Sequence, residues 1–164
     1  MSREIFEIVQ GMDLKNIETQ LALQCAPLIT GLKISNMLIV SNKDEKLVRI
    51  ILKRTGISCY RLLQNEKKIT LLLFRRNQLE KFLEREDVSE VLREEGYVEI
   101  QLGRILSIFQ MRYRAYMNGS KIFPHEMGLL LVSGGRCHWF YGTWRKEFSV
   151  FRILESLCRR RKKT

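Results

Sequence analysis

Two short apolar runs on either side of a polar turn constrain the fold of this chain more than any other feature. Residues 57–63 and 68–74 each have the length and composition typical of a strand, and Gln64, Asn65 and Glu66 lie between them. Strands joined by so few residues pair as an antiparallel hairpin. The chain is therefore expected to contain a sheet, whose apolar surface must pack against other elements.

Segments with helical periodicity surround this hairpin, and glycines mark several of their ends. Gly31, Gly56 and Gly96 each follow such a segment, in the position that often ends a helix. The helix that enters Cys25-Ala26-Pro27 must kink at the proline or restart with it in a first turn. The expected helices cover residues 2–11, 14–30, 43–55, 77–85, 87–95, 99–117 and 148–157.

Three further apolar segments, at residues 36–40, 128–132 and 137–144, are predicted to be strands. The fold class is thus mixed α and β, with a small mixed sheet of about four to five strands flanked by helices. At 164 residues, the chain is expected to form one compact domain over residues 1–158. A basic C-terminal tail, residues 159–164, follows it.

Composition indicates a cytoplasmic protein without a membrane partner. The N-terminus lacks the pattern of a secretory signal, and the longest apolar runs are far too short to span a bilayer. The four cysteines, at 25, 59, 137 and 158, form no Cys-x-x-Cys pair and match no disulfide framework. We therefore expect reduced thiols in a reducing compartment.

Positive charge is concentrated in the last two-fifths of the chain. Residues 1–99 carry 16 Lys or Arg against 15 Asp or Glu, whereas residues 100–164 carry 13 against 3, so +10 of the net +11 lies there. Aromatic residues near Trp139 interleave with these cations, as in surfaces that bind nucleic acid, although a half-buried strand with a solvated face would look the same. The nucleic-acid candidates are Arg136, Arg145, Lys146, Arg159, Arg160, Arg161, Lys162 and Lys163.

Two strings in the sequence carry a family resemblance. One runs from Cys25-Ala26-Pro27 to Gly31-Leu32-Lys33, with Asn36-Met37-Leu38 after it, and the other is Phe123-Pro124-His125-Glu126-Met127-Gly128-Leu129-Leu130-Leu131. Together they resemble a bacterial family common in Clostridia, domain of unknown function 3793. The resemblance implies no established activity, but it suggests an acidic redox partner such as a flavodoxin. Tyr141 and Trp144 are similar to a further family string, whereas the insert that family members usually carry before it is reduced here to residues 133–136.

Cys25 and His125 are the candidate catalytic residues. A thiol becomes a nucleophile when an imidazole or another cation stabilises the thiolate, and the fold commonly brings such a pair together from distant positions. Lys33 could supply a second positive charge, while Glu126 is an alternative partner for Lys33 in a structural ion pair. The alternative is a structural role for both residues, with a buried cysteine and a histidine that only makes structural hydrogen bonds. Candidate ligand-binding residues are Pro27, Lys33, Asn36, Glu126, Tyr141 and Trp144.

Residue types suited to metal binding occur in the chain without the spacing of a metal site. Cys25, His125, Glu126, Cys137 and His138 are ligand types suited to iron or zinc, but no two are spaced as a typical ligand pair. The sequence therefore predicts no metal site, identifies no cofactor and leaves open whether the chain is an enzyme.

The function expected first is the binding of a small ligand or cofactor, anionic or metal-containing, between the Cys-Ala-Pro and Pro-His-Glu segments. Nucleic-acid binding through the C-terminal cations is the first alternative. An adaptor that docks on an acidic redox partner is the second.

Overall fold

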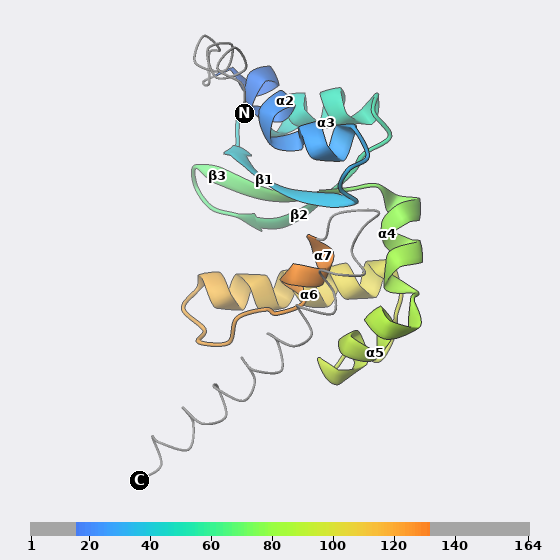
Figure 1. Cartoon of the computed structure of the whole chain (residues 1–164). Helices are drawn as coiled ribbons and strands as arrows, with labels where there is room; N and C mark the ends of the chain where they lie inside the picture. The colour runs from blue at the N-terminus through green and yellow to red at the C-terminus, as the bar shows by residue number, and fades with distance from the viewer. Residues whose placement is uncertain (1–15, 132–164) are drawn as a thin grey trace, which may run out of the picture.

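The computed structural model describes residues 16–131 (Figure 1). The helices expected at 2–11 and 148–157, the strand expected at 137–144 and the domain boundary at 158 lie outside these residues. In chain order the elements are α2 (Ile17–Ile29), β1 (Ser35–Ser41), α3 (Glu45–Lys53), β2 (Ser58–Gln64), β3 (Lys68–Phe74), α4 (Arg76–Leu83), α5 (Glu86–Glu94), α6 (Leu102–Met117) and α7 (Met127–Leu130).

The sheet contains three strands within residues 16–131, in the order β1-β3-β2, and β3 is antiparallel to both neighbours. Since β1 and β2 both oppose β3, they run parallel to each other, and β1, α3 and β2 form a split βαβ unit with β3 inserted. The mixed α and β class is thus confirmed, and the hairpin at 57–74 is present. The described residues do not confirm a sheet of four to five strands.

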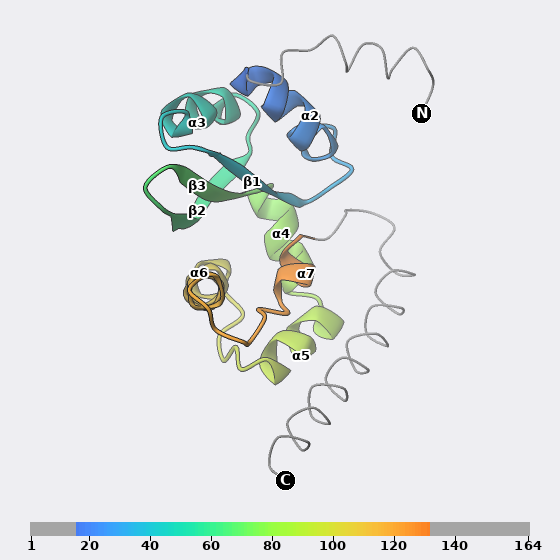
Figure 2. The same ribbon diagram turned by 90° about the vertical axis from the view of Figure 1, so that its left-hand side faces the viewer.

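Helices cover both faces of the sheet, giving three layers (Figures 1 and 2). α2 and α3 lie on one face, and α4, α5, α6 and α7 lie on the other. The central strand β3 supplies both cores: Leu71 and Leu73 point to α2 and α3, whereas Leu72 and Phe74 point to the opposite layer. Its continuous apolar sequence fits this position, because a strand buried on both faces has no polar side.

The end of α2 is held by a side chain from the sheet. The helix continues through Pro27 to Ile29, so it does not restart at the proline, and Gly31 follows with a φ of +80°. Arg75, directly after β3, donates from Nε to the Leu28 carbonyl at 3.2 Å and from Nη2 to the Ile29 carbonyl at 2.8 Å. A cation here also interacts favourably with the helix dipole.

A strand was predicted at 128–132, but residues 128–130 belong to the short helix α7, and residue 132 lies outside the described range. Leu129 and Leu130 are both buried in the core beneath the sheet. Adjacent residues of a strand point to opposite faces, so a strand could not bury both in that core. The Ser35 hydroxyl at the start of β1 donates to the Leu130 carbonyl, which fixes α7 against the sheet.

None of the helices within residues 16–131 has the length and hydropathy required to cross a bilayer.

Candidate functional site

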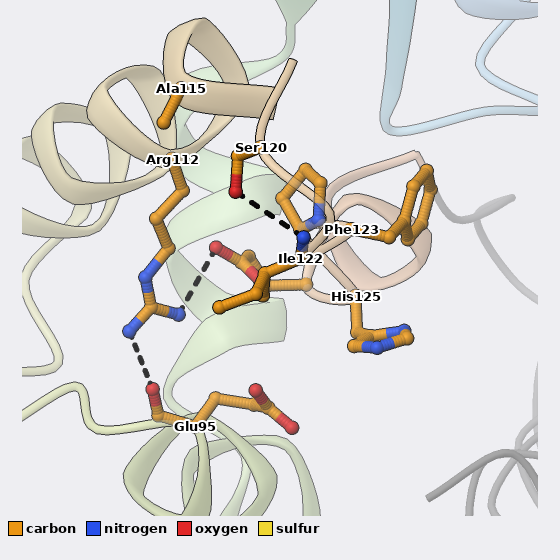
Figure 3. Close-up of a pocket in the computed structure, with 9 residues that line it drawn as sticks. Glu95, Arg112, Ala115, Ser120, Ile122, Phe123 and His125 are labelled. Carbon is orange, nitrogen blue, oxygen red and sulfur yellow. Dashed lines mark hydrogen bonds and ion pairs between the residues drawn. The ribbon is translucent and has the colours of Figure 1, made fainter. Parts of the chain in front are cut away.

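A pocket of about 330 Å³ lies on the α6 side of the sheet (Figure 3). Its walls come from the end of α5, from the C-terminal half of α6 and from the segment that leads into α7. The lining residues are Glu95, Arg112, Ala115, Ser120, Ile122, Phe123, Pro124, His125 and Glu126. The second family-like string therefore forms one wall of the pocket.

A buried carboxylate organises this wall. Glu126 is only 1% exposed, and its Oε1 accepts a hydrogen bond from the Tyr97 hydroxyl at 2.8 Å and a weaker one from Arg112 Nη1 at 3.3 Å. Arg112 Nη2 donates to the Glu95 carbonyl at 2.7 Å, and the guanidinium lies 4.9 Å from the centre of the Tyr97 ring. We call Tyr97, Arg112 and Glu126 the buried polar network. It joins the end of α5, the middle of α6 and the start of α7.

Local sequence explains how this network assembles. Gly96 has a φ of +88° and ends α5, which turns the next residue, Tyr97, into the core and leaves the Glu95 carbonyl facing α6. Burial raises the pKa of Tyr97, and the negative charge of Glu126 beside it raises this pKa further. Tyr97 therefore keeps its proton at neutral pH and acts as a hydrogen-bond donor.

His125 and Arg112 lie on opposite sides of the pocket (Figure 3). His125 is half-buried, and its ring meets Phe123 edge to face, with centroids 5.5 Å apart. Phe123 meets Tyr116 in the same manner at 5.2 Å. The side chain of Arg112 is 32% exposed, so part of this cation remains accessible from the pocket.

Cys25 lies elsewhere. It is fully buried in α2, between that helix and the sheet face formed by Leu38 and Leu71. Burial raises its pKa to about 11, so the thiol is neutral at physiological pH. His125 precedes α7 on the opposite face, and the structure does not bring the two side chains together because α2 and α7 cover different faces of the sheet. Of the two residues only His125 lines the pocket described above, and a role for either residue alone stays a prediction.

The other candidates near Cys25 support the end of α2. The Asn36 side chain donates to the Gln24 carbonyl at 2.6 Å, and the Lys33 backbone N–H donates to the Pro27 carbonyl at 2.8 Å. None of Pro27, Lys33 and Asn36 lines the pocket described above. The ion pair suggested between Lys33 and Glu126 is replaced by the one from Arg112.

Sequence reasoning missed the two partners of Glu126. Arg112 directly precedes Tyr113, a buried residue of the α6 core face, and Tyr97 directly follows the helix-ending Gly96. A large aromatic after such a glycine is a weak sign of a chain turning inward. No local pattern links either residue to Glu126, since the contact depends on how α5, α6 and α7 pack.

No group of three or more His, Cys, Asp or Glu side chains within residues 16–131 is arranged to hold a metal ion. The remaining candidates lie outside the described residues. They are Arg136, Cys137, His138, Tyr141, Trp144, Arg145, Lys146, Arg159, Arg160, Arg161, Lys162 and Lys163.

The family model described as Protein of unknown function (DUF3793) matches residues 21–132. The chain belongs to this family. The DUF3793 match contains both strings, one at the end of α2 and the other at the pocket wall. No curated protein and no solved structure matches the chain.

Proposed function

We propose that this domain binds a small molecule carrying one anionic group in the pocket beside the buried polar network. The observation that carries the proposal is the placement of Arg112 at the wall of a pocket of about 330 Å³. That volume lies within the range of small-molecule sites. The cation is held in place by the Glu95 carbonyl and Glu126, so little side-chain entropy is lost when it binds an anion.

The rest of the lining supports a small ligand of mixed polarity. Ala115, Ile122 and Phe123 form an apolar wall, and the His125 ring lies on the side opposite Arg112. Glu95 also lines the pocket and would repel a polyanion. A compact monocarboxylate that also carries a hydroxyl or amino group suits this lining best.

A steric variant tests the proposal without disturbing the buried network. Ala115 is exposed at the pocket wall, so Ala115→Phe would place a ring in the pocket. The matched control is Ser107→Phe, which adds the same ring at an exposed position of α6 that does not line the pocket. Both substitutions should leave the protein folded.

The measurement is ligand binding to the full chain. A panel of small carboxylates and phosphate monoesters is screened by thermal shift, and each hit is titrated calorimetrically against both variants. We expect at least about a tenfold weaker affinity for Ala115→Phe, because the ring occupies space that the ligand needs. The affinity of Ser107→Phe should be unchanged. A panel without any hit, together with native mass spectrometry showing no bound molecule in anaerobically purified protein, contradicts the proposal. So does equal affinity in both variants.

The nucleic-acid alternative depends on cations outside residues 16–131, and no contact within residues 16–131 favours a redox partner.

A further inference from the structure

The surface of α3 that faces away from the sheet is both basic and apolar. Val48 and Leu52 pack inward, whereas Ile50 is 64% exposed and Leu47 is 41% exposed. Lys46 and Lys53 are also exposed, and helical spacing puts them on the same side as Ile50. This side of α3 therefore presents two exposed aliphatic side chains between lysines.

The cations of this surface form no ion pair with an acidic residue of the described range, 16–131. Lys43, Lys46, Lys53 and Arg54 are exposed, and none forms an ion pair with another residue in the range 16–131. Glu45, in the first turn of the helix, forms ion pairs with two arginines instead. Its Oε1 lies 2.9 Å from Arg49 Nη2 and 2.7 Å from Arg61 Nη2. The arginines lower its pKa, so it stays ionised and neutralises these two partners rather than the lysines.

The neighbouring helix extends the apolar part of this surface. α2 and α3 lie side by side over the sheet in both views (Figures 1 and 2). No charged residue occurs between Thr19 and Leu32, and Leu23, Ile29 and Leu32 are 38%, 42% and 68% exposed. We call the exposed residues of this layer the outer face: Ala22, Leu23, Ala26, Ile29, Lys46, Leu47, Ile50, Lys53 and Arg54.

We propose that the outer face docks on the anionic surface of a lipid bilayer. The α3 cations lie at the level of the lipid phosphates, and Ile50 and Leu47 enter the boundary between headgroups and acyl chains, as in helices that lie in a membrane interface. Attraction of a protein with a net charge of +11 toward such a surface adds to the binding.

The exposed side chains favour lipid over nucleic acid. Nucleic-acid surfaces combine cations with aromatic rings that stack on bases, whereas the outer face carries aliphatic side chains. The sequence predicted no membrane partner because its longest apolar runs are too short to span a bilayer. Surface docking requires no spanning helix, and it is independent of the pocket, which lies on the other side of the sheet.

Vesicle co-sedimentation of the full chain tests the proposal. The probes are vesicles of phosphatidylcholine mixed with phosphatidylserine and vesicles of phosphatidylcholine alone. The test variants are Lys46→Glu/Lys53→Glu and Ile50→Ser, all at exposed positions. The matched control is Lys81→Glu/Arg93→Glu, which changes the net charge equally on α4 and α5, in the opposite layer.

The wild-type protein should sediment with the mixed vesicles and not with phosphatidylcholine alone. Lys46→Glu/Lys53→Glu should weaken partitioning by about thirtyfold or more, since each lysine near an anionic surface contributes roughly fivefold. Ile50→Ser should weaken it about tenfold, through lost burial of the aliphatic side chain. The Lys81→Glu/Arg93→Glu control should lose much less, and Ala115→Phe should bind as the wild type does.

Four outcomes overturn the proposal. The first is the absence of sedimentation with mixed vesicles at low salt. The second is an equal loss in the test and control charge variants, which indicates attraction by net charge alone. The third is binding that survives Lys46→Glu/Lys53→Glu but disappears when Arg159 to Lys163 are replaced by glutamine, which assigns it to the tail. A parallel titration with duplex DNA and RNA detects a nucleic-acid partner, and tighter binding there that needs Lys46 and Lys53 also counts against lipid.

Discussion

Replacing Glu126 tests whether the buried polar network holds the pocket wall in place. Glu126→Ala removes the carboxylate that accepts from both the Tyr97 hydroxyl and Arg112. Glu126→Gln keeps an oxygen that can accept from Tyr97 but removes the negative charge. Comparing the two substitutions separates the hydrogen bond from the ion pair.

The expected magnitudes follow from burial. Tyr97 is 1% exposed, so Glu126→Ala leaves a buried hydroxyl without its acceptor, which costs about 1–3 kcal/mol of unfolding free energy. Arg112 is 32% exposed and keeps its bond to the Glu95 carbonyl, so loss of its ion pair costs only about 1 kcal/mol. We expect a loss of about 2–4 kcal/mol for Glu126→Ala and about 1 kcal/mol for Glu126→Gln.

Urea unfolding followed by circular dichroism measures both changes. Glu90→Ala, at an exposed position of α5, is the control and should alter stability by less than about 0.5 kcal/mol. Tyr97→Phe should lower the free energy of unfolding by about 1 kcal/mol. The double variant Tyr97→Phe/Glu126→Ala has no buried hydroxyl left without an acceptor, so its loss should be smaller than the sum of the two single losses. A loss below about 1 kcal/mol for Glu126→Ala, or equal losses for the alanine and glutamine variants, would refute the reasoning.

Three further predictions concern single positions. The Cys25 thiol should react with iodoacetamide far more slowly in the folded protein than in urea. The pKa of Cys25 is about 11 in the folded protein and 9.0 in the unfolded chain, so the neutral thiol favours the folded state. Its contribution of about 2–3 kcal/mol to the free energy of unfolding is complete below pH 9 and is lost as the pH rises toward 11. Unfolding measured as a function of pH should show this decline in the wild type and not in Cys25→Ala. Arg75→Ala should destabilise the protein by about 1–3 kcal/mol in urea, through two lost bonds to the end of α2, whereas the exposed Arg76→Ala should change little. Gly96→Ala should cost about 1–2 kcal/mol because of its positive φ, whereas Gly103→Ala, in the first turn of α6 where a Cβ meets open space, should raise the melting temperature.

Elements with strong local signals were predicted well from the sequence. The strand 68–74 has the same bounds in the structure, because a continuous apolar run with a turn before it leaves few alternatives. The helix expected at 99–117 is α6, and its apolar residues at helical spacing, Ile105, Leu106, Phe109 and Tyr113, are buried. Gly31, Gly56 and Gly96 all adopt the positive φ expected after a helix.

The candidate site could not be predicted in the same way, because it depends on which face of the sheet each helix covers. Cys25 and His125 belong to segments with similar apolar character, and nothing local distinguishes their sides. The structure assigns α2 to one face and α7 to the other, so the pair is separated, whereas Arg112 and Glu126 meet through packing of α6 and α7. Contacts of this kind are set by the tertiary arrangement of whole elements.

The pocket is built largely from residues that the fold itself requires. In the second family-like string, Pro124 is buried, Glu126 completes the buried polar network, and Leu129 and Leu130 fill the core. Substitution of any of these residues would disturb stability and the pocket together, so a loss of ligand binding in such a variant could not be attributed to the site. Discriminating substitutions must therefore be made at the exposed wall, where Ala115 lies. A ring placed there changes the space available to a ligand and leaves the network that shapes the pocket intact.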